Sequence, residues 1–423
     1  MPSAYSTASL ISVRILVLQE SDWVAKGPHQ GHHLLERMRS RGHEVRVVDF
    51  EIRWADRREH SRLAPRRVFP DVHKVMEKGK ISVIRPLFLR LPLFDIVSLV
   101  FSHWLEVNRQ FREFRPDVVV GFGILNAFLG IAVARRHGVP FIHYVIDELY
   151  RLMPRRMLQG LSKVVEQADY QRASMVLSIN EALRDYTVSM GARSEITKVL
   201  PAGVDLGRYI NADGSGVRKR LGLTDGDLVL FYMGWLYPFS GLSEVAEEIV
   251  KPSAGRSRTP KLLAVGKGEL WEPLSGMASA AESRGRLKLE PWQPYNELPS
   301  YLAAGDICIL PARAVGLMEN IVPIKMYEYM AAGKPVIATR LPGLVREFGD
   351  GHGVVYVDDP HQVVSTALQL ADRGEINSLG ITARDFASKN DWEALADEFE
   401  RLLHDLSNHG PLTDVGTSNT SSN

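Results

Sequence analysis

The sequence predicts an α/β protein built from two Rossmann-like domains with parallel sheets, and three observations lead to this fold class. The chain has 423 residues, which is too long for a single hydrophobic core. Short, nearly continuous apolar runs alternate with amphipathic segments, as expected when helices cover both faces of a parallel sheet. This alternation stops at residues 211–226, which are rich in Gly, Asp and Asn, and then begins again. The interruption is the predicted linker.

The composition is that of an ordinary soluble globular protein, with 45% hydrophobic and 24% charged residues. The net charge of +1 conceals a local basic excess between Glu51 and Arg90. A single cysteine, Cys308, excludes a disulfide within the chain and favours a reducing, cytoplasmic location. The first residues lack the basic start and long apolar core of a signal peptide, so residues 1–12 are predicted to be a flexible tail.

The first domain is predicted over residues 13–208. A strand at 14–19, a loop, a helix that ends at Gly42 and a second strand at 44–50 form an opening βαβ unit. Gly27 and Gly31 in the loop would allow the backbone to approach a ligand closely, but their spacing is not GxGxxG and indicates no particular nucleotide. Further strands are predicted at 117–121, 140–146, 174–179 and 198–201.

The second domain is predicted over residues 209–389 and repeats the same alternation. Its strands are predicted at 228–233, 261–265, 287–290, 306–310, 336–339 and 354–357, and its helices at 242–250, 296–304, 322–332 and 363–373. An amphipathic helix at 392–406 follows. The polar residues 409–423 are predicted to be disordered.

A basic and apolar segment, residues 53–104, interrupts the first domain. Its apolar part, Pro86–Trp104, contains Arg90, Asp95 and two prolines, so it lacks the run of about 18 apolar residues that a membrane span requires. Two interpretations remain: a helix buried in the domain, or a peripheral contact with an anionic membrane surface. Because no aromatic platform alternates with the basic residues, nucleic acid is not an expected partner.

The stretch 319–339 predicts a loop, a short helix and a strand. Asn320 is a candidate helix cap, Pro323 suits the first turn, and Gly333 suits the left-handed residue that ends a helix. Lys325 and Glu328 are three residues apart and therefore share a face near the helix start, where free N–H groups favour a phosphate. The alternative is a solvated surface helix with a Lys/Glu pair.

Five segments of the chain, taken in order, resemble motifs of one enzyme family. They are ITKVLPAGVDLGRY, LFYMGWLYPFSGLSEV, LLAVGKGE, ELPSYLAAGDICILPA and PIKMYEYMAAGKPVIATRLPG, of which the last is the most specific. The chain thereby resembles the group 1 family of retaining nucleotide-sugar glycosyltransferases. The resemblance implies the GT-B fold, with two facing Rossmann-like domains and a cleft between them. It also implies that residues 13–208, completed by the helix at 390–407, bind the acceptor, and that residues 209–389 bind the donor.

The resemblance assigns roles to individual residues. Glu328 falls on the glutamate that accepts hydrogen bonds from the ribose hydroxyls of the donor. Gly266 and Gly268 would lie beside the base, and the backbone at Trp292 would pair with the base edge. The remaining implied positions are Gly343 and Leu344 near the diphosphate, Gly27 and Gly31 in a loop beside the reacting sugar, and His29 in the acceptor site.

The chain departs from the family pattern at three places. Trp235 and Ser240 stand where the family has the Arg and Lys that neutralise the diphosphate, although the spacing from Gly234 to Gly241 is retained. The first residue of the Glu-x7-Glu pair is Asn320, with Glu319 one residue early, and an amide can still donate and accept hydrogen bonds to the sugar. The usual His before Asp147 is Ile146, and His143, three residues upstream, is the candidate histidine of the acceptor site.

These departures move the expected chemistry to other residues. Lys325, helped by helix amides and by Arg313, is expected to stabilise the leaving diphosphate. In the family, the acceptor hydroxyl loses its proton toward that leaving group, so no protein nucleophile is required. Asp147 could orient or deprotonate the acceptor, and a helix cap is an equally good explanation for it.

No metal or other cofactor is expected beyond the nucleoside-diphosphate sugar as co-substrate. No DxD motif ends a strand of the first domain, and the histidines at 29, 32 and 33 lack a cysteine or carboxylate at ligand spacing. The expected partners are a nucleotide sugar, a glycan or lipid-linked acceptor, and an anionic membrane surface contacted through residues 53–104 on the inner face of the membrane. Two other functions remain open: a sugar-nucleotide 2-epimerase of the same fold, and a sugar-nucleotide-binding subunit without catalysis.

Overall fold

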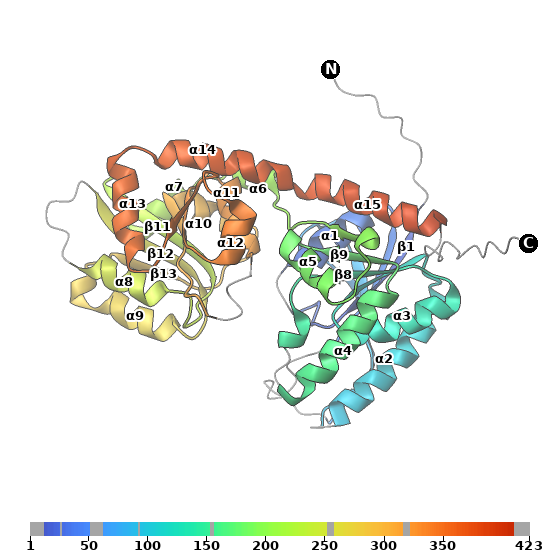
Figure 1. Cartoon of the computed structure of the whole chain (residues 1–423). Coiled ribbons are helices and arrows are strands. Elements are labelled where there is room, and N and C mark those ends of the chain that lie inside the picture. Colours follow the sequence, from blue (N-terminus) through green and yellow to red (C-terminus); the bar gives the residue numbers. More distant parts are fainter. Residues whose placement is uncertain are drawn as a thin grey trace, which may run out of the picture. The chain divides into compact units, whose positions relative to one another are not determined.

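The computed structural model describes residues 12–25, 28–50, 62–91, 94–152, 156–251, 258–315 and 322–409. These residues form two compact units (Figure 1). The first unit runs up to Pro201 and includes the residues from Glu393 on, and the second spans Ala202–Trp392. The division therefore precedes the predicted boundary at 208, because Ala202, Val204 and Tyr209 are buried in the core of the second unit. The predicted tails lie outside the described residues, apart from Ser12 and His409.

The first unit contains an eight-stranded sheet with the order β10-β9-β8-β7-β1-β2-β5-β4. Its strands are β1 (Arg14–Gln19), β2 (Glu44–Val48), β4 (Arg67–Val72), β5 (Ile81–Arg85), β7 (Val118–Phe122), β8 (Phe141–Val145), β9 (Met175–Ser178) and β10 (Thr197–Val199). All neighbours are parallel except β4 and β5, which pair antiparallel. The first sheet is therefore mainly parallel, as predicted, and the segment between the second strand and the apolar run adds β5 and the antiparallel edge strand β4 to it.

Helices surround this sheet. They are α1 (Gln30–Ser40), α2 (Phe94–Glu113), α3 (Leu125–His137), α4 (Arg156–Arg172), α5 (Glu181–Ser189) and α15 (Trp392–His409). A short antiparallel pair, β3 (Leu63–Ala64) and β6 (Phe88–Leu89), and two single turns of 3-10 helix, η2 (Leu149–Leu152) and η3 (Ser194–Ile196), complete the unit. The apolar segment thus contributes β6 and the first half of α2. Within the described part of the chain, no helix has the length and apolarity to cross a membrane.

The helix α15 is held against the first unit by ion pairs over a very long sequence separation. Arg37 Nε donates to Glu393 Oε1 at 2.7 Å, across 356 residues, and Arg41 Nη1 donates to Glu400 Oε2 at 2.7 Å. Burial of the apolar face of α15, which includes Phe399, Leu402 and Leu403, accompanies these ion pairs. The helix α15 therefore belongs structurally to the first unit.

The second unit contains a six-stranded, wholly parallel sheet with the order β13-β12-β11-β14-β15-β16. Its strands are β11 (Asp227–Trp235), β12 (Thr259–Lys267), β13 (Leu287–Glu290), β14 (Ile307–Leu310), β15 (Val336–Thr339) and β16 (Val354–Val357). The strands β11, β12 and β13 follow one another outward on one side of the sheet, and β14, β15 and β16 follow one another outward on the other side. The strand order therefore reverses between β11 and β14, where ligands bind at the carboxyl ends of such sheets.

Two apolar cores lie on the two faces of the second sheet. The helices of this unit are α6 (Leu206–Ile210), α7 (Ser215–Leu221), α8 (Leu242–Val250), α9 (Trp271–Ser279), α10 (Leu298–Ala304), α11 (Ile324–Ala331), α12 (Pro342–Phe348), α13 (Gln362–Asp372) and α14 (Ile376–Ala387), with 3-10 turns η4 (Ala281–Ser283) and η6 (Ser388–Asn390). The predicted linker 211–226 contains α7, which packs on α10. Gly214 lies so close to the backbone of Ala304 that a Cβ would collide with it, so this stretch is a packed part of the unit rather than a linker.

Candidate functional site

The helix α11 begins near the reversal point of the second sheet. Pro323 is its N-cap residue, with φ −70° and ψ 135°, and Gly333 follows its end with φ +68°. The predicted left-handed glycine is therefore confirmed, and Pro323 lies one position outside the helix rather than in its first turn. Asn320, predicted as the cap and as a sugar contact, and Glu319 lie outside the described residues.

Lys325, in the first turn of α11, reaches back to β11. Its Nζ donates to the hydroxyl of Tyr232 at 3.2 Å and lies 4.3 Å from the centre of that ring. Gly234 leaves room for it, because a Cβ at this position would come within 2.9 Å of Nζ. Gly234 also has φ +126°, which disfavours any other residue. The ammonium group is therefore held at the carboxyl end of β11, next to the reversal point.

Glu328 lies one turn further along α11 and is buried. The Tyr209 hydroxyl donates to its Oε1 at 2.8 Å. Burial raises the pKa of Glu328, while the hydrogen bond from Tyr209, the charge of Lys325 and a hydrogen bond from Tyr295 oppose this rise. Tyr209 and Tyr295 are functional candidates that the sequence analysis missed. The segment ITKVLPAGVDLGRY contains Tyr209, but nothing local shows that it would contact Glu328, 119 residues away.

Aromatic residues surround a lysine at the carboxyl ends of β11, β12 and β13. Lys267 Nζ lies 5.5 Å from the centre of the Trp235 ring and 5.2 Å from that of the half-exposed Trp292. The indole N–H of Trp235 donates to Glu269 Oε2 at 2.9 Å. Lys267 therefore brings a cation close to the position where Trp235 replaces the arginine expected from the family.

Ser240, which replaces the expected lysine, is buried in the loop before α8. Its backbone N–H donates to Tyr237 O at 3.0 Å, and its Oγ has no hydrogen-bond partner among the described residues. Arg313, predicted to assist Lys325, instead forms an ion pair with Glu244 of α8. Lys325 and Lys267 therefore supply the cations at the carboxyl ends of β11 and β12.

The glycines of the β12 loop have a packing role of their own. A Cβ on Gly266 would collide with the carbonyl oxygen of Gly234, and one on Gly268 would come within 2.6 Å of the Leu236 backbone. Close approach of β11 and β12 explains both glycines. Gly343 and Leu344 lie in the first turn of α12, where helix geometry leaves N–H groups without a partner inside the helix, while the Leu344 side chain is buried in the core.

In the first unit, two of the predicted site residues, His29 and Gly31, lie at the start of α1. Gly27 lies outside the described residues, and Gly31 is not in a loop but in the first turn of α1, where its Cα faces the ring of Trp23. His29 is the N-cap residue of α1, and its ring lies 4.3 Å from that of His32 and 5.6 Å from that of Trp23. The three rings therefore pack against one another within the first unit.

His143 does not fit its predicted place at the acceptor. It lies in the middle of β8, is fully buried and packs against Tyr170 of α4 with ring centres 5.1 Å apart. Burial lowers its pKa to about 4, so the ring is neutral at physiological pH. Asp147, in contrast, lies two residues beyond the end of β8 at the carboxyl edge of the first sheet and before η2, which is the position the sequence predicted.

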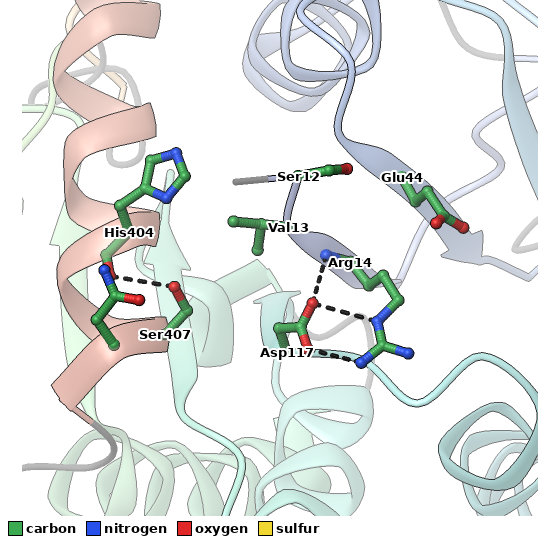
Figure 2. Close-up of a pocket in the computed structure, with 8 residues that line it drawn as sticks. Ser12, Val13, Arg14, Glu44, Asp117, His404 and Ser407 are labelled. Carbon is green, nitrogen blue, oxygen red and sulfur yellow. Dashed lines mark hydrogen bonds and ion pairs between the residues drawn. The ribbon is translucent and has the colours of Figure 1, made fainter. Parts of the chain in front are cut away.

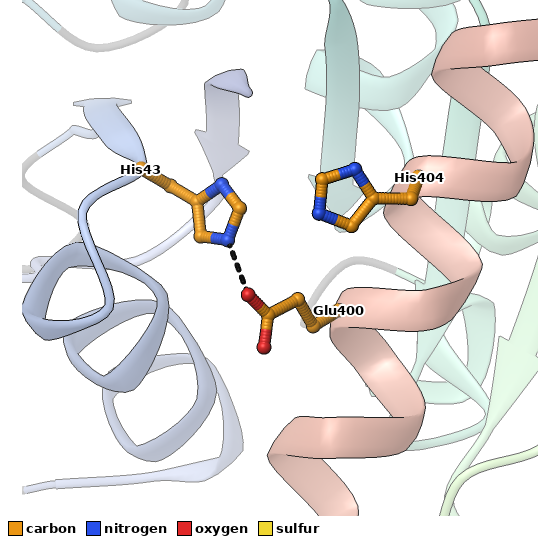
Figure 3. A group of neighbouring side chains, drawn as sticks. All are labelled: His43, Glu400 and His404. Atoms are coloured by element: carbon orange, nitrogen blue, oxygen red, sulfur yellow. Dashed lines mark hydrogen bonds and ion pairs between the residues drawn. The ribbon is translucent and has the colours of Figure 1, made fainter. Parts of the chain in front are cut away.

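A group of side chains that could hold a metal ion lies elsewhere, between β2 and α15 (Figure 3). It consists of His43, Glu400 and His404, whose ligand atoms lie within 4.8 Å of one another. The backbone N–H of Val13 donates to His43 Nδ1 at 3.1 Å, so the ring proton is on Nε2, which donates to Glu400 Oε1 at 2.8 Å. A metal ion would require Nε2 without its proton, so this group is better explained as an anchor for α15.

A cavity of about 510 Å³ borders the same helix (Figure 2). Arg14 and Glu44, which begin β1 and β2, line it together with His404 and with Asp117, which accepts hydrogen bonds from the Arg14 guanidinium. It lies at the amino ends of these strands, so it is at the opposite edge of the sheet from Asp147. Ligands of this type of fold bind at the carboxyl edge.

Comparisons with known proteins agree with this architecture. Residues 29–203 match the family model of the glycosyl transferase 4-like domain, and residues 227–373 match that of glycosyl transferases group 1. The D-inositol 3-phosphate glycosyltransferase of Geodermatophilus obscurus is 26% identical over 385 residues, which are 84% of this chain and 83% of the relative. That of Thermobispora bispora is 26% identical over 387 residues, which are 84% and 87% of the two chains.

Solved structures resemble the whole chain. Anabaena Alr3699/HepE in complex with UDP has a TM-score of 0.69 at 16% identity and covers 93% of this chain and 100% of its own. Sucrose-phosphate synthase from Thermosynechococcus elongatus has a TM-score of 0.68 at 18% identity, with 93% and 99% coverage. The two matched family models, their order along the chain and the likeness of fold together show that this chain is a group 1 glycosyltransferase with the GT-B fold.

Proposed function

We propose that this enzyme is a retaining, metal-independent glycosyltransferase that moves a sugar from a nucleoside-diphosphate sugar to a glycan or lipid-linked acceptor. The observation that carries the proposal is the position of Lys325. Its ammonium group lies at the carboxyl end of β11, against Gly234 and Tyr232, where a diphosphate would meet the sheet. HepE, which shares the fold, was solved with UDP and with UDP-glucose, which supports a nucleotide sugar as donor.

In the proposed reaction, the bond between the anomeric carbon and the diphosphate oxygen breaks while the acceptor oxygen bonds to the same face of that carbon. The acceptor proton passes to the leaving phosphate oxygen. Negative charge therefore grows on the diphosphate, and a fixed cation lowers the barrier by stabilising it. Lys325 supplies that charge, and the amides of Gly343 and Leu344 supply further donors.

The other residues position the two substrates. Glu328 accepts hydrogen bonds from Tyr209 and Tyr295, and its carboxylate has further lone pairs to accept a ribose hydroxyl. Trp235 and Trp292 offer flat apolar surfaces beside Lys267 for the donor. Asn320 and Glu319 are proposed to contact the sugar hydroxyls, and Asp147 to orient the acceptor hydroxyl. No step of this scheme needs a metal ion.

The proposal is tested by incubating the purified chain with a panel of UDP-, GDP- and ADP-sugars. The acceptors should include D-inositol 3-phosphate, because the relatives named above are transferases for it. Proton NMR of the product should show that the anomeric configuration of the donor is retained, and EDTA should leave the rate unchanged. Loss of activity with EDTA and rescue by Mn²⁺ would contradict metal independence.

The same assay separates the two other functions. An epimerase would convert the donor without forming a glycoside, and a binding subunit would be stabilised by a nucleotide sugar but would release no nucleoside diphosphate in the presence of any acceptor. We further propose that the enzyme acts in the cytoplasm, on the inner face of the membrane. The exposed apolar and basic residues of α2, α3 and α4 support contact with a membrane.

A further inference from the structure

Three apolar side chains form an exposed stripe on α2. Val97, Phe101 and Leu105 are 67%, 65% and 52% exposed, and their spacing of four residues places them on one side of the helix. The opposite side, which includes Leu99, Val107 and Phe111, is buried. Soluble proteins expose single apolar side chains commonly, but rows of them indicate a surface for interaction.

The helix α4 also exposes apolar side chains and buries its acidic ones. Leu161 and Val164 are 64% and 61% exposed, whereas its two acidic residues, Glu166 and Asp169, are buried against the unit. Since α3 contacts both α2 and α4, the three helices form one layer on the first unit (Figure 1). The solvent side of this layer therefore presents apolar residues and no acidic residue from α4.

The charged residues of the layer complement an anionic surface. Among the described side chains of α2, α3 and α4 that are exposed, one is acidic, Glu113, and six are basic: Arg109, Arg112, Arg135, Arg136, Lys163 and Arg172. We propose that this face, defined by the exposed residues of α2, α3 and α4, docks on an anionic lipid bilayer. The apolar side chains enter the boundary between headgroups and acyl chains, and the cations meet the lipid phosphates. A second copy of the chain fits poorly, because it would oppose like charges.

The position of the apolar residues along the helices relates the membrane contact to the acceptor. The helix α2 ends at Glu113, shortly before the amino end of β7, and α4 ends at Arg172, shortly before that of β9. Both helices therefore begin near the carboxyl edge of the sheet, and α2 is about 30 Å long. Val97, Phe101 and Leu161 lie in the first halves of their helices, toward the same edge as Asp147, and Val164 lies at the middle of α4. Docking would bring this edge to the bilayer, which deepens the proposed function by identifying a membrane-bound acceptor.

The test measures sedimentation of the full chain with vesicles of phosphatidylcholine alone and of phosphatidylcholine with phosphatidylglycerol. The wild type is expected to bind the anionic vesicles and not the neutral ones, and high salt should weaken its binding. Replacing Phe101→Ser together with Leu161→Ser should lower the bound fraction roughly five-fold or more. Arg112→Glu with Lys163→Glu should do the same.

Matched controls lie on the second unit. Ile381 is 65% exposed on α14, so Ile381→Ser removes an equally exposed apolar side chain, and Lys219→Glu reverses an exposed charge on α7. Both should bind vesicles like the wild type. Each variant should also retain transfer to a water-soluble acceptor, so loss of docking is distinguished from loss of catalysis. The proposal is overturned if the wild type does not sediment with anionic vesicles, if the double apolar variant binds equally well, or if that variant converts a dimer to a monomer in analytical ultracentrifugation.

Discussion

Lys325 of α11 and Tyr232 of β11 are joined by a hydrogen bond of 3.2 Å, and the ammonium group lies 4.3 Å from the centre of the tyrosine ring. The pair links the helix and the strand on the two sides of the reversal point of the second sheet. Because Trp235 and Ser240 occupy the positions where the family has cations, we propose that this lysine supplies much of the charge expected of them. The predictions below follow from this arrangement and from the buried carboxyl groups of both units.

Replacing Lys325→Ala should lower kcat by roughly 10²–10³-fold, because it removes a fixed charge that stabilises the leaving group. The melting temperature should change little, since the ammonium group makes one hydrogen bond at the edge of the core. Lys219→Ala, on the exposed face of α7, is the matched control and should keep full activity. Near-normal turnover of the Lys325 variant would exclude the proposed role.

Replacing Gly234→Ala should displace the ammonium group, because the new Cβ would lie 2.9 Å from Nζ and the residue has φ +126°. We expect a loss of activity similar to that of the lysine variant, together with a destabilisation of about 1 kcal/mol or more. Gly276→Ala, in α9 with open space around its Cα, should leave activity intact and stabilise the helix slightly. Thermal denaturation and steady-state kinetics of both variants provide the comparison.

Donor binding should weaken as the pH falls, since Glu328 accepts hydrogen bonds best when ionised. Burial raises the pKa of this carboxyl, so the midpoint should lie above that of a free glutamate. Tyr209→Phe removes a hydrogen bond that favours the ionised form and should move the midpoint to higher pH. Calorimetric titration with a nucleoside diphosphate over a range of pH measures this.

Tyr186→Phe serves as the control for this midpoint, because the hydroxyl of Tyr186 donates to Glu166 in the first unit at 3.2 Å. It removes a comparable tyrosine–glutamate hydrogen bond away from the donor site. A midpoint that stays constant in the Tyr209 variant, or that shifts equally in both variants, would show that Glu328 does not contact the donor.

Asp169 predicts a pH-dependent stability for the first unit. It is buried, neither carboxyl oxygen has a hydrogen-bond partner among the described residues, and burial together with Glu20 and Glu166 raises its pKa to about 9. Between about pH 4 and this value the unfolded chain is ionised while the folded protein keeps the proton, so the stability of the wild type should fall as the pH rises.

Replacing Asp169→Asn removes that cost and should raise the melting temperature more at about pH 8 than at about pH 5. The exposed Asp185 of α5 provides the control, since Asp185→Asn should have a small effect at both pH values. An equal effect of the Asp169 variant at the two pH values would show that this carboxyl is ionised in the folded protein.

Local features of the sequence were sufficient for most of the second unit. Its six predicted strands overlap β11 to β16, and Gly333 has the left-handed conformation that was predicted. A parallel strand buried on both faces needs a continuous apolar run, and a helix end needs a residue that tolerates positive φ. Both requirements act within a few residues, so they can be read without knowing the neighbours in space.

Features that depend on distant contacts were missed or wrongly placed. The strands β4 and β5 were not predicted, since they lie at or next to the edge of the sheet, and α4, whose acidic residues face the unit, has no ordinary amphipathic pattern. In the sequence, His143 stands close to Asp147, as an active-site histidine would. The packing of α4 on β8 nevertheless buries its side chain. Burial depends on what covers a residue, and the covering element lies far away in the sequence.

The sequence by itself determined the two α/β domains, the family and the helix that carries Lys325 and Glu328, because periodicity, turn chemistry and motif order are properties of neighbouring residues. Only the tertiary structure decided that Lys325 lies against Gly234 and Tyr232, and that the Tyr209 hydroxyl donates a hydrogen bond to Glu328. These contacts join residues far apart in the sequence, such as Tyr232 and Lys325, which are 93 residues apart, and Tyr209 and Glu328, which are 119 residues apart. Local patterns leave such contacts open, and they form only when the sheets and their covering helices pack.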